Sequence, residues 1–348
     1  MKEIILNFVT KITIYRITKK LTTMKKILFI SVATLLMCFF TLYIKAQSTY
    51  TYNGSGALNS VNNWTPIPPD FTSPNQIFVV TNVSSTTLSA AGWTVSGSGS
   101  EIRIGDGSSS TKLTVASDAT LMVSGDAKLR VQNNGTLNLR QSNLNYLPSS
   151  GDVIIDNGST VEWAQTSAVN VWPLNYWNFT LLGANKYIPA YTSMTVQSQY
   201  NNPNDLILYF NYNNLSDGNN SLYILGDVIG NLVLISSKNT TTLVIGGTST
   251  SSINITLPLY NQIFGRFELN RNSLVKWNKS IGAWVAWYSC SVTTGTIDIT
   301  GFANGHILYL YGSANLGATW RSKNTLVMDF RGSGSISGHL NFESGFNS

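Results

Sequence analysis

The sequence predicts an all-β protein, and three observations favour a right-handed parallel β-helix within that class. Short segments of alternating apolar and polar residues recur every eight residues between positions 112 and 139. Turn-forming residues separate these segments. No stretch after residue 46 has the periodicity of an α-helix. An antiparallel meander that closes into a sandwich or a barrel also has short strands at this spacing, so it is the alternative fold.

The eight-residue repeat is carried by segments of four residues. Their second and fourth positions are apolar and their first and third are mostly polar, which places Leu and Val on one face of each strand. Such short strands cannot bury a face alone, but they can when each stacks on its equivalent one turn later. Three units would form a triangular coil of about 24 residues. The segments are 112–115, 120–123, 128–131 and 136–139, and the register returns at 152–155 and 160–163.

The N-terminal region is typical of an export signal. Residues 1–23 precede Met24, which looks like the better start of translation. From there, two lysines, the uncharged stretch 27–44 and Ala46 predict a signal peptide over 24–46, cleaved after Ala46. An uncleaved membrane anchor is the alternative, because 18 apolar residues just reach spanning length. We therefore expect a secreted protein, or one at the outer cell surface, with no membrane segment after cleavage.

The charge of the chain is concentrated in this leader. Of the 22 Lys and Arg residues, eight lie within positions 1–46, beside one acid. The remainder has 14 basic and 15 acidic residues, so nothing in it indicates a basic surface for nucleic acid. Charged residues make up 11% of the chain, against about 25% in ordinary soluble domains. Ser, Thr, Asn and Gly supply the polarity instead.

The mature chain divides into two repeat regions. Residues 47–165 carry the eight-residue repeat, and residues 166–348 carry a longer one. Similar long units begin at Thr160 and Thr242, and a third begins at Thr325 and is incomplete at Ser348. We expect the second region to be either truncated or capped by this partial copy.

The opening of the mature chain carries a resemblance. Tyr50-Thr51-Tyr52-Asn53-Gly54, followed by Asn62-Asn63-Trp64-Thr65-Pro66 and the Leu-x-Val repeats, resembles the start of secreted β-helix repeat proteins of Bacteroidetes-group bacteria. The Ala46-Gln47 boundary is similar too. The resemblance implies an adhesin-like role at the cell surface. Such proteins often end in a sorting domain, and this sequence shows none.

The sequence shows no recognisable catalytic centre, cofactor site or metal site. β-Helix enzymes that cleave polysaccharides need clustered carboxylates, whereas Asp118 and Asp126 are expected at different corners, where turn formation explains them. A Ca²⁺ site is the alternative for these acids. Cys290 is alone in the mature chain and is expected to be buried. His306 and His339 lie beside glycines in expected turns.

Aromatic residues are the remaining functional signal. Tyr209, Tyr212, Trp284 and Trp287 are candidate carbohydrate contacts, since aromatic faces stack on sugar rings. The alternative is that they fill the core, and strand alternation places Trp284 and Trp287 on opposite faces. The sequence thus predicts an exported structural or adhesive surface protein without catalysis, whose partners are polysaccharide or other surface proteins. A β-helix that binds or cleaves carbohydrate is the alternative.

Overall fold

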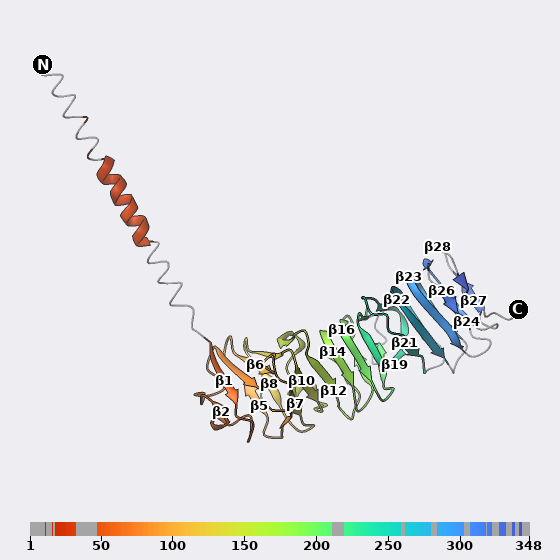
Figure 1. Cartoon of the computed structure of the whole chain (residues 1–348), viewed down its shortest axis with the longest axis horizontal. Helices are drawn as coiled ribbons and strands as arrows, with labels where there is room; N and C mark the ends of the chain where they lie inside the picture. The colour runs from red at the N-terminus through yellow and green to blue at the C-terminus, as the bar shows by residue number, and fades with distance from the viewer. Residues whose placement is uncertain are drawn as a thin grey trace, which may run out of the picture. The chain divides into compact units, whose positions relative to one another are not determined.

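The computed structural model places the chain in two compact units, Met1–Gln47 and Ser48–Ser348. It describes residues 11, 16, 18–32, 47–81, 83–210, 219–258, 262–279, 284–302, 307–317, 319–321, 327–331, 336–337 and 341–342. In the first unit, residues 18–32 are helical (Figure 1). No helix among the described residues has both the length and the hydropathy of a membrane span. The predicted cleavage site after Ala46 lies outside the described residues.

The second unit is a parallel β-solenoid of about 11 turns, which confirms the predicted fold class (Figure 1). Leu113 pairs with Leu137, and Leu137 pairs with Val161, so the step from one coil to the next is constant here. The step equals three of the eight-residue units, which is the coil length that the repeat predicts.

The first coils have three sides, as expected. Strands β7 (Thr111–Val115) and β10 (Gly135–Leu139) stack in one sheet, while β8 (Leu121–Val123) and β9 (Lys128–Val131) between them belong to two others. One side holds β1 (Ser48–Tyr52), β3 (Gln76–Val80), β6 (Glu101–Ile104), β9 and β11 (Val153–Ile155), with β2 (Trp64–Thr65) at its edge; the second holds β5 (Trp93–Val95) and β8; the third begins with β4 (Thr86–Leu88), β7, β10 and β12 (Thr160–Trp163).

The strands that follow β12 extend the solenoid. Among the described residues of its first half there are three 3-10 helices, η1 (Val61–Asn63), η2 (Leu144–Tyr146) and η3 (Ser150–Asp152). The later strands are β13 (Val169–Asn170), β14 (Asn175–Leu181), β15 (Lys186–Ile188), β16 (Ser193–Asn202), β17 (Ile207–Phe210), β18 (Ser221–Ile224), β19 (Asp227–Ile235), β20 (Ser237–Ile245), β21 (Ile253–Thr256), β22 (Gln262–Lys279), β23 (Trp284–Phe302), β24 (Ile307–Leu310), β25 (Ala314–Leu316), β26 (Thr319–Arg321), β27 (Val327–Phe330), β28 (Ile336–Ser337) and β29 (Asn341–Phe342).

Coil length varies in this later part. Phe179 pairs with Val161 after a step shorter than that of the regular coils. Ile224 pairs with Val196 after a longer step, and Ile245 pairs with Ile224 after a shorter one again. Strand pairing is continuous across residue 165, because β12 pairs with β14. This stacking explains the long units seen in the sequence. The first unit begins on β12 and ends on β14, which stacks on β12. The second begins on β20 and ends on β22, which stacks on β20.

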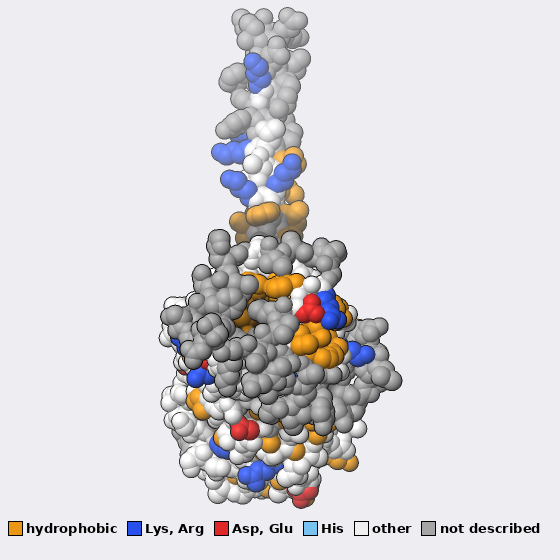
Figure 2. All heavy atoms as spheres, turned by 90° about the vertical axis from the view of Figure 1, so that its right-hand side faces the viewer, with side chains coloured by type: hydrophobic (Ala, Val, Ile, Leu, Met, Phe, Trp, Pro, Cys, Tyr) orange, Lys and Arg blue, Asp and Glu red, His pale blue; other side chains and the backbone are white. Residues whose placement is uncertain are grey.

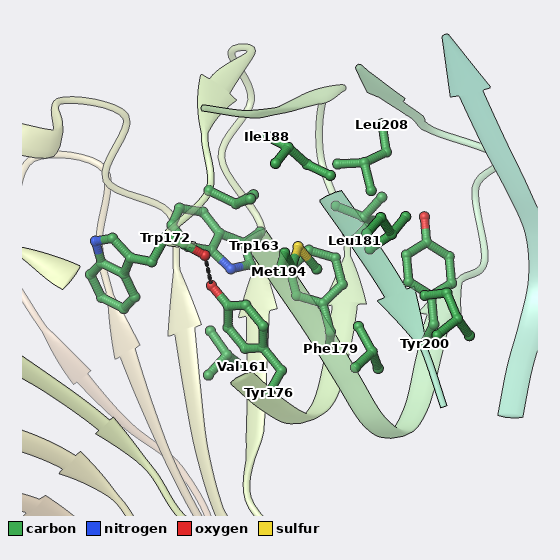
Figure 3. Packing of buried hydrophobic residues seen from close by; sticks show 14 of the residues in the cluster. Val161, Trp163, Trp172, Tyr176, Phe179, Leu181, Ile188, Met194, Tyr200 and Leu208 are labelled. Carbon is green, nitrogen blue, oxygen red and sulfur yellow. Dashed lines mark hydrogen bonds between the residues drawn. The ribbon is translucent and has the colours of Figure 1, made fainter. Parts of the chain in front are cut away.

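The core lies inside the coils, and its inward columns change from aliphatic to aromatic residues between the regular coils and the later ones. Leu137, Val161, Phe179 and Tyr200 form one column, each fully buried and in register with the next. Figure 3 shows Val161, Phe179 and Tyr200 of this column among the other buried side chains. The hydroxyl of Tyr176 donates to the Trp172 carbonyl oxygen at 2.7 Å.

The motif that carries the resemblance forms the first turn of the solenoid. Strand β1 pairs in parallel with β3 and antiparallel with β2, so β2 lies at the edge of this side. Trp64 is buried, and its indole nitrogen donates to the Leu58 carbonyl at 3.0 Å. Its ring packs against Tyr52, Phe78 and Trp93 at 5.2 to 5.6 Å. The conspicuous Asn-Trp pair therefore has a packing role in this turn.

Candidate functional site

The candidate site is a group of aromatic side chains on the outside of strands β23 and β24. Along β23, Val285 and Trp287 are buried, while Trp284 is partly exposed and Tyr288 is 38% exposed. The alternation that strand geometry requires thus separates the two tryptophans, as the sequence predicted. We name Trp284, Tyr288, Tyr309 and Tyr311 the outer aromatic cluster.

The rings of this cluster contact one another across neighbouring coils. Trp284 and Tyr309 have centroids 5.7 Å apart, and Tyr309 and Tyr311 have centroids 5.9 Å apart. Tyr288 and Tyr311 are stacked at 4.9 Å with an angle of 15° between their planes. The pairing of β23 with β24 sets this arrangement, because it places Ala286 beside Tyr309 and leaves room for the larger neighbouring rings.

A cation lies against the cluster. The Arg331 guanidinium is 4.2 Å from the centre of the Tyr309 ring, within the range of a cation–π contact. Its Nε donates to the Asp329 carboxylate at 2.7 Å, and that hydrogen bond raises the pKa of Arg331. Figure 2, which views the C-terminal side of this unit, shows hydrophobic side chains gathered beside an adjoining acidic and basic side chain.

The four aromatic residues predicted from the sequence have different positions. Trp284 belongs to the outer aromatic cluster. Tyr209 is partly exposed and packs on Tyr187 with ring centroids 5.0 Å apart. Trp287 has no exposed surface and packs on Phe267 and Trp277 in the core, so the prediction that it contacts carbohydrate is wrong and its alternative, core packing, holds. Tyr212 lies outside the described residues.

Tyr209 lies on the same side of the solenoid as the outer aromatic cluster. Tyr209 pairs with Ile235, and Ser237, two residues further along the chain, is the next outward-facing residue. Ser237 pairs with Ile263 on the following strand. Ile263 in turn pairs with Ala286, and Ala286 pairs with Tyr309. Aromatic rings therefore recur at two places along one outer wall.

The acidic residues that the sequence singled out are separated. Asp118 lies in the turn between β7 and β8, and Asp126 in the turn between β8 and β9, so they occupy different corners as expected. Asp106 shapes its own turn: the backbone N–H groups of Ser109 and Ser108 donate to it and hold its pKa well below the usual range.

The two acids that flank β11 are in ion pairs. Asp152 accepts from Lys128 at 2.7 Å, and this hydrogen bond, followed by one from Ser149, lowers its pKa. Asp156 accepts from Arg130 at 2.9 Å. Across the described ranges, no three His, Cys, Asp or Glu side chains gather in a way that could hold a metal ion.

The cysteine of the described residues offers no reactive thiol. Cys290 is buried, as predicted, and burial raises the pKa of its thiol well above the usual range, which keeps it protonated. His306 and His339 lie outside the described residues. The chemistry that the described surface offers is aromatic contact and hydrogen bonding.

The fold and this surface define a parallel β-solenoid protein with an aromatic outer wall. No protein-family model, curated protein or solved structure matches the chain. The class therefore follows from the strand register and the packing alone.

Sequence reasoning missed Tyr309 and Tyr311. The signal that could have found them is the alternation in Ile307-Leu308-Tyr309-Leu310-Tyr311, which places both tyrosines on the face opposite the two leucines. Their contact with Trp284 and Tyr288 depends on the coil length between the strands, and the sequence alone does not give that length.

Proposed function

We propose that this chain is an exported, non-catalytic surface protein whose solenoid acts as a structural or adhesive element. The observation that carries the proposal is the outer wall of stacked strands, where hydroxyl and amide side chains alternate with the buried columns. One such ladder is Thr136, Thr160 and Asn178, one partly exposed residue from each coil. Ladders of this kind offer many weak hydrogen bonds over a long surface, which suits adhesion better than chemistry at one point.

The acidic side chains support the non-catalytic part of the proposal. Glycoside hydrolysis by the usual route needs two carboxyl groups on either side of one bond. Asp152, Asp156 and Glu162 are instead paired with Lys128, Arg130 and Lys112.

A second function, binding of polysaccharide, is favoured by the outer aromatic cluster. Its rings are exposed in part, and an arginine beside them adds a hydrogen-bond donor. Partly exposed aromatic rings with polar neighbours suit the apolar faces and hydroxyl groups of sugar rings. In this reading the solenoid adheres to a glycan-coated surface.

The test is a pull-down of the purified chain on insoluble polysaccharides, with the release of reducing ends measured in the same tubes. We expect retention on at least one polysaccharide and no release. Release of reducing ends would overturn the non-catalytic assignment. Sequencing the N-terminus of the exported chain tests export separately: Gln47 is expected, and an N-terminus upstream of Ile27 contradicts cleavage.

Matched variants distinguish binding by the outer aromatic cluster from nonspecific adsorption to the polysaccharide. Tyr309→Ala together with Tyr311→Ala removes the centre of the cluster, and Tyr146→Ala removes a tyrosine that is 47% exposed in η2. Retention should fall in the double variant and persist in the control. Equal loss in both, or in neither, would exclude the cluster as the binding surface.

A further inference from the structure

We propose that a second surface, a polar groove at one corner of the solenoid, binds a linear glycan that lies parallel to the solenoid axis. The groove encloses about 440 Å³ and shares no residue with the outer aromatic cluster. The inference rests on the proposed binding of carbohydrate and gives it a defined site. We name this surface the axial groove; it is lined by Trp177, Gln197, Ser198, residues 225–227 and residues 248–251.

A β-bulge opens the axial groove. Tyr176 pairs with Val196 and Asn178 pairs with Gln199, so one residue of β14, Trp177, faces two residues of β16, Gln197 and Ser198. A bulge of this kind bends the strand and re-aims the side chains around it, and such bulges are frequent beside functional sites. All three residues of this bulge line the groove.

The groove runs across successive coils. Val196 pairs with Ile224, and Ile224 pairs with Ile245, so residues 177, 197, 225–227 and 248–251 come from four consecutive turns. Neighbouring strands are 4.7 to 4.9 Å apart, which makes three steps about 14 Å long. A ligand that contacts the whole lining must therefore be extended along the axis, as several linked sugar rings are.

The backbone of the groove is held from below by a buried arginine. Arg271 is 2% exposed, and its guanidinium donates to the carbonyl oxygens of Gly226 at 2.5 Å and Ser251 at 3.2 Å. Its Nε donates to the hydroxyl of Ser273 at 3.0 Å. One side chain thus links the groove corners of two successive coils, and a rigid floor reduces the ordering cost of binding.

Close backbone packing adds to this rigidity. A Cβ atom at Gly226 would lie 1.9 Å from the carbonyl oxygen of Ser198, so only glycine allows the two coils to approach this closely. The floor is therefore backbone, and the side chains that reach a ligand stand at its margins.

The groups at the margins match a sugar ring. Trp177 offers a partly exposed aromatic ring, Gln197 an amide, and residues 248–251 a run of four hydroxyl groups. The carboxylate of Asp227 accepts a hydrogen bond from the Ser249 hydroxyl, and bonds from Ser249 and Ser251 lower the pKa of Asp227. An ionised carboxylate beside an aromatic ring accepts well from sugar hydroxyls.

The same groups argue against other ligands. The guanidinium donors of Arg271 face carbonyl oxygens below the groove, so no cation lines the groove to attract phosphate or an acidic polymer. Asp227 is the one carboxylate in the lining, which falls short of the ligand set of Ca²⁺. A neutral or N-acetylated glycan fits this combination best.

The test is calorimetric titration of the full chain with soluble hexasaccharides, one neutral and one N-acetylated, and with the matching monosaccharides. We expect a hexasaccharide to bind at least tenfold more tightly than its monosaccharide. Trp177→Ala and Asp227→Asn should each weaken binding at least tenfold, and Trp177→Phe should restore most of it. Thermal unfolding of each variant checks the fold, which should be retained because Trp177 and Asp227 are not buried.

The double variant Tyr309→Ala with Tyr311→Ala distinguishes failure of the axial groove from failure of the proposed carbohydrate binding. If Tyr309→Ala with Tyr311→Ala abolishes binding and Trp177→Ala does not, carbohydrate binding stands and the axial groove is excluded. If the unaltered chain binds none of the probes, both the groove and the proposed carbohydrate function are overturned. Loss in Trp177→Ala and Asp227→Asn with the cluster variant unchanged establishes the groove.

Discussion

The coils from β7 to β12 and the coils from β14 to β27 use the same stacking in different ways. In the first group the step between coils is constant, the stacked inward residues are Leu and Val for the most part, and ion pairs lie on the outer faces. In the second group the step varies and the inward columns include Trp, Phe and Tyr. The outer aromatic cluster and the axial groove both lie on this second group.

This comparison indicates that unequal steps between coils create recesses on the surface of a solenoid. With a constant step, equivalent residues stack in flat ladders that offer a partner no recess. The bulge at Trp177, together with a long step before Ile224 and a short one after it, offsets neighbouring corners and opens the axial groove. Candidate binding surfaces therefore lie where the repeat is weakest in the sequence.

The largest expected effect tests the aromatic core of the later coils. Trp287→Ala should destabilise the chain by about 3 to 5 kcal/mol, because a fully buried indole that packs on Phe267 and Trp277 is lost. Urea unfolding followed by circular dichroism measures the loss. Tyr288→Ala, next in sequence and exposed, should cost about 1 kcal/mol or less. Equal losses would contradict the assigned faces of β23.

Arg271→Gln should have the next largest effect. It removes the guanidinium that donates to Gly226 and Ser251, and hydrogen bonds to a charged donor contribute about 1.5 to 3 kcal/mol. We expect a loss on the order of 2 kcal/mol, together with weaker glycan binding. Arg271→Lys keeps the charge but not the planar fork, so it should recover only part of the stability. Unchanged stability in Arg271→Gln would show that the groove corners hold together without this link.

Features that recur at a fixed step can be predicted from the sequence, whereas features that depend on unequal coils cannot. The alternation in Leu113, Leu137 and Val161 recurs at a fixed step, so periodicity alone predicts strands, coil length and inward residues. Trp287 shows the limit: alternation separates it from Trp284 but does not say which of the two faces inward. The groove residues Trp177 and Asp227 lie far apart in the sequence and meet through a bulge and unequal coils, which no local pattern encodes.

A smaller, pH-dependent effect is expected from buried lysines of the later coils. Lys186 is fully buried and donates to the carbonyl oxygen of Gln165 at 3.3 Å, and burial lowers its pKa from 10.5 to about 8. Burial lowers the pKa of Lys279 to about 8 as well. Above pH 8 the unfolded chain binds these protons and the folded chain releases them, so the free energy of unfolding should rise with pH.

The window for this rise is pH 8 to about 10, where the tyrosines of the unfolded chain begin to ionise. Urea unfolding at half-unit steps of pH measures it. Lys186→Met removes one of the two lysines and should reduce the slope without abolishing it. A free energy that is flat or falling over this window would show that both ammonium groups are as stable in the fold as in water.

The smallest effect is expected from the ion pairs of the regular coils. Lys112 contacts Glu162 at 2.6 Å across two coils, and the Lys112 side chain is 35% exposed. Exposed pairs contribute about 0.2 to 1 kcal/mol and are screened by salt. Lys112→Met should therefore cost about 0.5 kcal/mol at low salt and less at high salt, as urea unfolding at both ionic strengths would show. A loss well above this range at both salt concentrations would mean that charge pairing, rather than the stacked Leu and Val columns, holds the regular coils together. In that case the two halves of the solenoid would differ in what stabilises them as well as in their surfaces.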